Sequence, residues 1–294
     1  MEKQIGVAWE RPHPGPFAWG MIEKKDGEFD FSQADRYVKA AQDNGVLLLG
    51  TIWPFADWDQ AKCRQASACE VGPADTFYNS EIPNSRCKPC DMDKYSAFLR
   101  ALAERYDGDG VDDMPGLVLP VRYWEVLNEP EMQSGELTFF KGTASDYLEV
   151  LKASSKAIKE ACPECKIVQA GAAGTEQYML DYWAGQLDAG AADYFDIANI
   201  HYINNGDLAS LNVKPFKALF TERGISRPIW VTEAEYGEAS TDAAVKSSTE
   251  GALSAGASKV FFTRFAVGIR GPPTPGKFSS VYLELADMGC NKEG

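Results

Sequence analysis

Short apolar segments alternate with amphipathic helical segments along almost the whole chain, and this alternation limits the folds that are open to it. The apolar segments are typical of strands, and apolar residues recur at helical spacing between them. We expect seven strands, over residues 5–9, 46–53, 121–128, 166–170, 195–202, 229–233 and 259–265. Strands that alternate with helices predict a parallel sheet with helices packed outside it.

The ends of the expected strands indicate which parallel fold this is. No Gly-x-Gly-x-x-Gly sequence follows a strand, so the dinucleotide-binding fold lacks its signature. Polar residues gather where strands end, which is typical of the (β/α)8 barrel of TIM-barrel type, whose sites lie at the C-terminal face. We expect one barrel domain over residues 1–294, ending in a short helix over 279–288. Because seven strands are found, either one lies in a segment interpreted as loop or the first βα unit is missing.

A polar, cysteine-containing segment follows the expected strand 46–53 and runs over about 54–90. It is far longer than an ordinary βα loop, so we expect a functional rim or lid over the C-terminal face. Its cysteines could bind zinc, because Cys87-Lys-Pro-Cys90 has half of the required spacing. Two disulfides are favoured, because the gap between Cys63 and Cys69 is too wide for the usual zinc ribbon. The three possible pairings remain open.

Cys162 and Cys165 bracket a Pro-Glu turn between a helix and a strand, and Cys290 is left over. A redox motif would place the first cysteine at a helix N-terminus, so a local disulfide is favoured here. The cysteine pattern favours an oxidising compartment, and hence secretion, or a thermophilic source. The N-terminus shows no signal-peptide apolar region.

The charge balance limits the partners of the chain. With 43 acidic and 29 basic residues the net charge is −14, so the surface repels phosphate backbones and nucleic-acid binding is not expected. No apolar run approaches the length of a membrane span. The oligomeric state leaves no signal in the sequence.

Two apolar segments about a hundred residues apart end in carboxylates. Tyr-Trp-Glu-Val-Leu-Asn runs into Glu129 and Pro130, where proline ends the strand. Ile-Trp-Val-Thr runs into Glu233, and Glu235 follows two residues later on the same side of an extended chain. Two carboxylates that face each other across a cleft supply the proton donor and the nucleophile or base for hydrolysis of a glycosidic bond. Glu233 is preferred to Glu235, because it ends the apolar run directly; the alternative for each is a structural contact.

Other polar and aromatic residues at strand ends are candidates for supporting roles. Arg11 ends the first strand, where a guanidinium could keep a carboxylate ionised. His201 and Tyr202 end the fifth, where either could bond the nucleophile or a sugar hydroxyl. Trp53 and Trp58 are candidate sugar-stacking platforms, with loop packing as the alternative.

The segment Trp-Glu-Val-Leu-Asn-Glu-Pro at 124–130 resembles the fourth-strand motif of retaining glycoside hydrolases of clan A, and Trp-Val-Thr-Glu at 230–233 resembles their seventh-strand motif. Residues 7–31 are similar to the second-strand region of families 39, 42 and 5. The resemblance implies that Glu129 is the acid/base and Glu233 the nucleophile, that Asn128 bonds the sugar 2-hydroxyl, and that Arg11 supports Glu233. It implies a carbohydrate substrate and neither cofactor nor metal.

The chain departs from the clan pattern in three places. Strand one and its helix have no counterpart, Thr263-Arg264-Phe265 stands where an eighth-strand tryptophan is common, and the cysteine-containing segment is not a clan feature. Two alternatives to a retaining glycosidase therefore stay open. One is a degenerate carbohydrate-binding barrel, and the other is a barrel hydrolase that uses zinc at the cysteine-containing segment.

Overall fold

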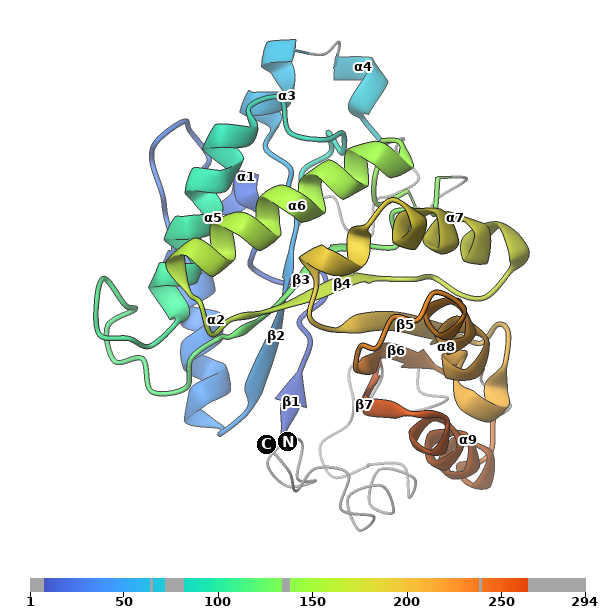
Figure 1. Ribbon diagram of the computed structural model, residues 1–294. Helices are drawn as coiled ribbons and strands as arrows, with labels where there is room; N and C mark the ends of the chain where they lie inside the picture. Colours follow the sequence, from blue (N-terminus) through green and yellow to red (C-terminus); the bar gives the residue numbers. More distant parts are fainter. Residues whose placement is uncertain (1–7, 64–65, 72–81, 134–137, 238–239, 264–294) are drawn as a thin grey trace.

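A computed structural model describes residues 8–63, 66–71, 82–133, 138–237 and 240–263 (Figure 1). Strands and helices alternate from one end of these residues to the other. The strands are β1 (Trp9–Glu10), β2 (Leu47–Ile52), β3 (Tyr123–Asn128), β4 (Lys166–Gly171), β5 (Ala198–Ile203), β6 (Ile229–Glu235) and β7 (Ala257–Phe262). The helices are α1 (Trp19–Ile22), α2 (Ser32–Asp43), α3 (Asp57–Cys63), α4 (Ala66–Cys69), α5 (Met92–Tyr106), α6 (Ala144–Ala161), α7 (Gln177–Asp188), α8 (Val213–Glu222) and α9 (Asp242–Ala255), with short 3-10 turns at Ala191–Tyr194 and Leu208–Ser210. The helix expected over 279–288, part of the first and last expected strands, and Cys290 lie outside the described residues.

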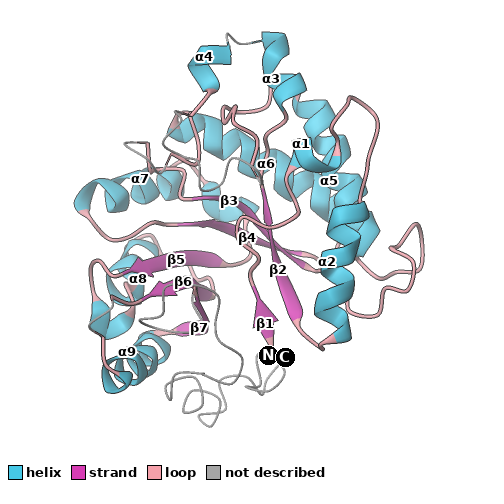
Figure 2. Ribbon diagram, turned by 180° about the vertical axis from the view of Figure 1, so that it is seen from behind, coloured by secondary structure: helices cyan, strands magenta, loops and turns pink. Residues whose placement is uncertain are grey.

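The seven strands run parallel and follow one another in chain order. Ladders join β1 through β4 and, separately, β5 through β7. Parallel bridges from Val168 to Ile197 and from Ala172 to Ile200 connect the two groups. The longer helices surround the strands in Figures 1 and 2. The prediction of a TIM-barrel type α/β fold is confirmed, and each of the seven expected strands has a counterpart among the described residues.

No ladder joins β7 to β1 within the described residues, so side chains connect these two edges. Seven apolar residues, one from each strand or its start, form a ring inside the barrel, here called the apolar ring. Its members are Trp9, Leu49, Tyr123, Val168, Ile197, Trp230 and Phe261. The Trp9 ring lies 5.6 Å from that of Trp230 and 6.4 Å from that of Phe261, both edge to face. Large aromatic side chains thus pack between β1 and β7, the two edges that no ladder joins among the described residues.

Helix boundaries follow local hydrogen bonding. The Asp91 carboxylate accepts a hydrogen bond from the backbone N–H of Lys94 and caps α5. Ser32 does not cap α2, because it is already helical and its N–H donates to the Asp30 carboxylate. No described helix is long and apolar enough to cross a membrane.

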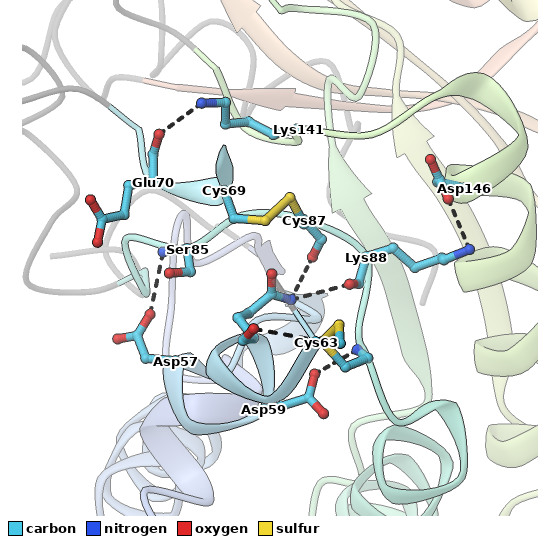
Figure 3. The surroundings of a disulfide bond; sticks show 12 residues. Asp57, Asp59, Cys63, Cys69, Glu70, Ser85, Cys87, Lys88, Lys141 and Asp146 are labelled. Carbon is cyan, nitrogen blue, oxygen red and sulfur yellow. Dashed lines mark hydrogen bonds and ion pairs between the residues drawn. A yellow bond between two sulfur atoms is a disulfide. The ribbon is translucent and has the colours of Figure 1, made fainter. Parts of the chain in front are cut away.

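The cysteine-containing segment is held by two disulfides. Cys63 is bonded to Cys90 and Cys69 to Cys87, so the preference for disulfides is confirmed and the zinc interpretation is wrong. Polar contacts support the bonds (Figure 3), including a hydrogen bond from the Cys90 N–H to the Asp59 carboxylate, at 2.7 Å. Helices α3 and α4 of this segment lie beyond the C-terminal end of β2 (Figure 1).

The remaining pair of cysteines joins a helix to the next strand. Cys162 follows α6 and is bonded to Cys165, directly before β4. Both are buried. The bond is a local staple, as expected, and its sulfurs are shielded from the reagents that a redox motif needs.

Candidate active site

Inside the barrel, a layer of polar side chains lies next to the apolar ring, on the side toward the C-terminal ends of the strands. Alternate residues of a strand point to the same face, so the residue two positions after a ring member also points inward. Five positions of this kind carry buried or nearly buried polar side chains, and we call them the polar layer: Arg11, Thr51, Glu125, Asn199 and Thr232. Buried polar groups require hydrogen-bond partners.

Glu125 lies at the centre of the polar layer and is fully buried. Its Oε2 accepts from Nε of Arg11 at 2.5 Å and from the Thr51 hydroxyl at 2.7 Å. Its Oε1 accepts from Nδ2 of Asn199 at 2.6 Å and from the Gly171 N–H at 3.3 Å. This carboxylate therefore connects both groups of strands.

Arg11 spans three acceptors with its planar guanidinium. Besides Glu125, Nη1 donates to Oε1 of Glu233 at 2.6 Å and Nη2 donates to Oδ1 of Asn128 at 2.7 Å. The side chain is only 3% exposed. Charge-assisted bonds of this kind fix geometry as well as charge, so Arg11 orients two predicted site residues at once.

The end of β3 has an unusual backbone that aims Asn128 and Glu129 into the site. Leu127 has φ of 73° and Glu129 has φ of 41°, in a region that costs a non-glycine residue on the order of 1–3 kcal/mol. The turn at Leu127 breaks the strand alternation, so Leu127 packs in the main core while Asn128 faces Arg11. Bonds from Arg11 and His201 hold this conformation.

Glu129 is 3% exposed and is paired with His201. Its Oε1 lies 2.7 Å from Nδ1 of the imidazole. Burial raises the pKa of Glu129, although the bond to His201 opposes the change. Burial would lower the pKa of His201, but the two glutamates outweigh it and raise that pKa. Glu129 therefore retains a proton more readily than an exposed glutamate.

Glu233 has the opposite electrostatic environment. Burial acts to raise its pKa, but His201 and Arg11 outweigh burial and hold the pKa at about 2. The ring of His13 also faces this carboxylate, with Nδ1 at 4.0 Å from Oε1. Burial and Arg11 lower the pKa of His13 to about 3, so this imidazole is neutral at neutral pH. Glu233 is thus ionised over the whole physiological range.

The two carboxylates face each other across a short distance. One ligand atom each from Glu129, His201 and Glu233 lie within 4.8 Å of one another. Such a group has the composition of a metal site, but the guanidinium of Arg11 lies 2.6 Å from Glu233 and already neutralises it. A cation there would be repelled by Arg11, so we assign no metal ligands.

The structure brings Arg11, Asn128, Glu129, His201 and Glu233 together, while the other candidates lie elsewhere. Trp53 is fully buried, packs against His13 and donates to the Pro14 carbonyl, so its ring offers no surface to a sugar. The Trp58 ring contacts Trp19 and lies under Lys62, away from these carboxylates.

Two further candidates stand on the fifth and sixth strands. Tyr202 follows the inward His201 and so points to the opposite face, where its ring lies 5.9 Å from that of Tyr236. Glu235 lies opposite Ile203 and is not a member of the cluster of Glu129, His201 and Glu233 among the described residues.

Sequence reasoning missed four members of the polar layer, together with His13. The available signal was a polar residue two positions after an inward apolar residue, as in Tyr-Trp-Glu at 123–125 and Trp-Val-Thr at 230–232. That signal becomes usable only when the inward face of each strand is known. His13 carried no periodic signal, because it lies in the loop after β1.

Comparison with solved structures finds glycosidases of similar fold. A glucosidase from Croceicoccus marinus matches 89% of this chain with a TM-score of 0.61 and 16% identity. A family 39 glycoside hydrolase from Bacteroides cellulosilyticus matches 99% of the chain (TM-score 0.59, 16% identity), and an endo-β-1,4-mannanase from Thermotoga petrophila matches all of it (TM-score 0.60, 13% identity). No family model and no curated protein matches the sequence.

These similarities confirm the resemblance in fold to glycoside hydrolases. The chain spans 54% of the length of the glucosidase, 59% of the family 39 enzyme and 72% of the mannanase.

Proposed function

We propose that this chain is a retaining glycoside hydrolase that cleaves β-linked glycosides or polysaccharides by double displacement, with residues 1–294 forming one catalytic barrel domain. One observation carries the proposal. Buried Glu129 and partly buried Glu233 have carboxylate oxygens within 4.8 Å of each other and pKa values displaced in opposite directions. Groups with such opposed environments divide acid and nucleophile roles between them.

The short separation supports retention. Retaining enzymes hold their carboxyl groups about 5–5.5 Å apart, so that one can attack the anomeric carbon directly. Inverting enzymes need room for a water molecule and place the groups about 6.5–9.5 Å apart. One oxygen of Glu129 lies within 4.8 Å of one oxygen of Glu233, which favours the shorter, retaining separation.

The electrostatics support the assignment of roles. Glu233 is ionised and oriented by Arg11, so it attacks the anomeric carbon and forms a glycosyl–enzyme bond. Glu129, with its raised pKa, gives its proton to the departing glycosidic oxygen. It then takes a proton from the water that releases the sugar from Glu233. Asn128, held by Arg11, is available to the sugar 2-hydroxyl.

The proposal is tested by hydrolysis of a panel of aryl β-glycosides and β-glycans, with the anomeric form of the first product read by proton NMR. We expect the β-anomer first, and near-complete loss of turnover in Glu129→Gln and Glu233→Gln. Release of the α-anomer would contradict retention. Saccharide binding by the wild-type protein without turnover would instead support a degenerate carbohydrate-binding barrel.

A further inference from the structure

Glu125 has a feature that the proposed reaction does not use. It is fully buried, and every group bonded to it donates a hydrogen. A carboxylate that is ionised can only accept. The direction of each hydrogen bond around Glu125 is therefore fixed. Two chains of consecutive hydrogen bonds, here called the first and second series, begin at Glu125.

The first series leads to the nucleophile. Nε of Arg11 donates to Glu125, which leaves Nη1 and Nη2 for Glu233 and Asn128. Because each of the three guanidinium nitrogen atoms donates to a different acceptor, the three bonds together fix the plane of the guanidinium. Glu125 supplies the only one of the three that is both charged and fully buried.

The second series leads to the acid/base. Because Nδ2 of Asn199 donates to Glu125, its Oδ1 faces the Thr232 hydroxyl, which donates to it at 2.8 Å and lies farther, at 3.5 Å, from Oε1 of Glu125 itself. The Thr232 oxygen is then left to accept from Nε2 of His201, at 3.0 Å. With Nε2 carrying this hydrogen, Nδ1 faces Oε1 of Glu129 at 2.7 Å, where it accepts while the imidazole is neutral and donates once the imidazole is protonated.

We infer that Glu125 is a positioning residue for both catalytic carboxylates: it fixes Arg11 against Glu233, and through Asn199 and Thr232 it fixes the tautomer of His201 that faces Glu129. This inference rests on the proposed function for the roles of the two carboxylates. The bonding pattern itself does not depend on that proposal.

Loss of each series has a defined consequence. An imidazole released from Thr232 can carry its hydrogen on Nδ1, donate to ionised Glu129 and so lower the pKa of Glu129. A guanidinium released from Glu125 no longer holds Glu233 in place, so the pKa of Glu233 rises. The charged or titratable groups that act on Glu233 include Arg11, His13, His201 and Glu129, and those that act on Glu129 include His201, Glu233, Arg11, Glu131 and Tyr178.

The test uses three variants of the 294-residue chain. Glu125→Gln introduces an NH₂ group among donors and disturbs both series. Thr232→Val removes only the hydroxyl of the second series. Thr51→Val is the matched control, because Thr51 also donates to Glu125 but leads to neither catalytic carboxylate. The threonines are buried alike, so the two valine variants change volume and burial equally.

The readout is the titration of glutamate side-chain carboxyl carbons by ¹³C NMR without substrate, with the two signals assigned by their absence in Glu129→Gln and Glu233→Gln. In Thr232→Val we expect the pKa of Glu129 to fall by about one unit and that of Glu233 to stay unchanged. In Glu125→Gln we expect the pKa of Glu129 to fall and the pKa of Glu233 to rise. In Thr51→Val both should stay at wild-type values.

Equal shifts in Thr51→Val and Thr232→Val would overturn the inference, because a general loosening of the barrel would then explain them. An unchanged or lower pKa of Glu233 in Glu125→Gln would also overturn the inference, because removing the negative charge of Glu125 would by itself lower the pKa of Glu233. If Glu125→Gln does not fold, the comparison of Thr232→Val with Thr51→Val tests the inference by itself. These titrations need no turnover, so failure of the hydrolysis assay counts against the proposed function and not against the positioning role.

Discussion

Glu131 gives the clearest quantitative test of the structure, because it is buried and lies outside the catalytic pair. Its Oε1 accepts from the Trp183 indole N–H at 2.9 Å and from the Ala173 N–H at 2.7 Å. Its Oε2 has no hydrogen-bond partner among the described residues. Burial outweighs these two bonds and raises the pKa of Glu131 to about 7, from 4.5.

A raised carboxyl pKa makes stability depend on pH in a defined direction. The folded protein holds this proton more tightly than the unfolded chain, so the contribution is fully present below pH 4.5 and is lost as pH rises through 7. With these two values, linkage gives a loss of about 2.5 kcal/mol between pH 5 and pH 8. Glu131→Gln cannot titrate and should escape this loss.

The measurement is urea unfolding, followed by tryptophan fluorescence, at pH 5 and pH 8. Relative to wild type, the free energy of unfolding of Glu131→Gln should increase by about 2.5 kcal/mol from the lower to the higher pH. The variant is expected to be no more stable than wild type at pH 5, because the new NH₂ lacks an acceptor. Glu164→Gln, at a side chain 72% exposed, is the control and should show no such change. A pH-dependent difference below about 1 kcal/mol for Glu131→Gln would refute the argument from burial.

Three further outcomes are expected. Glu235→Gln should retain most activity while Glu233→Gln loses nearly all of it, and the reverse result in hydrolysis assays would move the nucleophile to Glu235. In the pH profile of kcat/KM, the acidic limb should lie well below pH 4, because the pKa of Glu233 is about 2. The basic limb should lie above the ordinary glutamate range, because the pKa of Glu129 is raised. An acidic limb near pH 5 would contradict this expectation. Thiol titration without reductant should find Cys63 and Cys90 blocked, and free thiols in the native protein would exclude the disulfide. Replacing both cysteines by serine should lower the free energy of unfolding, measured by thermal unfolding, by roughly 3–4 kcal/mol, because the bonded cysteines are 27 residues apart in sequence.

Much of the fold follows from local sequence patterns. The alternation of apolar strands with amphipathic helices predicted seven parallel strands, because strand and helix periodicities are local properties. The ends of β3 and β6 were equally readable, since a carboxylate after an apolar run, with Pro130 closing the first, marks where a strand stops. Glu129 and Glu233 could therefore be singled out before any tertiary contact was known.

The surroundings of those carboxylates depended on tertiary structure. Whether a side chain faces the barrel interior depends on strand register and on irregularities such as the positive φ of Leu127, and no local pattern reports either. For this reason the sequence could not show that His201 faces the barrel interior while Tyr202 packs near Tyr236, and Glu125 was read as one more residue of an apolar strand.

The disulfide pairing shows the same division between sequence and structure. Cysteine spacing indicated a stapled segment, but the three pairings are equivalent in sequence, because a bond requires Cα atoms to approach within about 7 Å. The fold brings Cys63 to 5.9 Å from Cys90, and Cys69 to 5.2 Å from Cys87. The sequence by itself determined which residues can do chemistry. The tertiary structure decided which of them meet, because contact across a barrel depends on the positions of all the strands together.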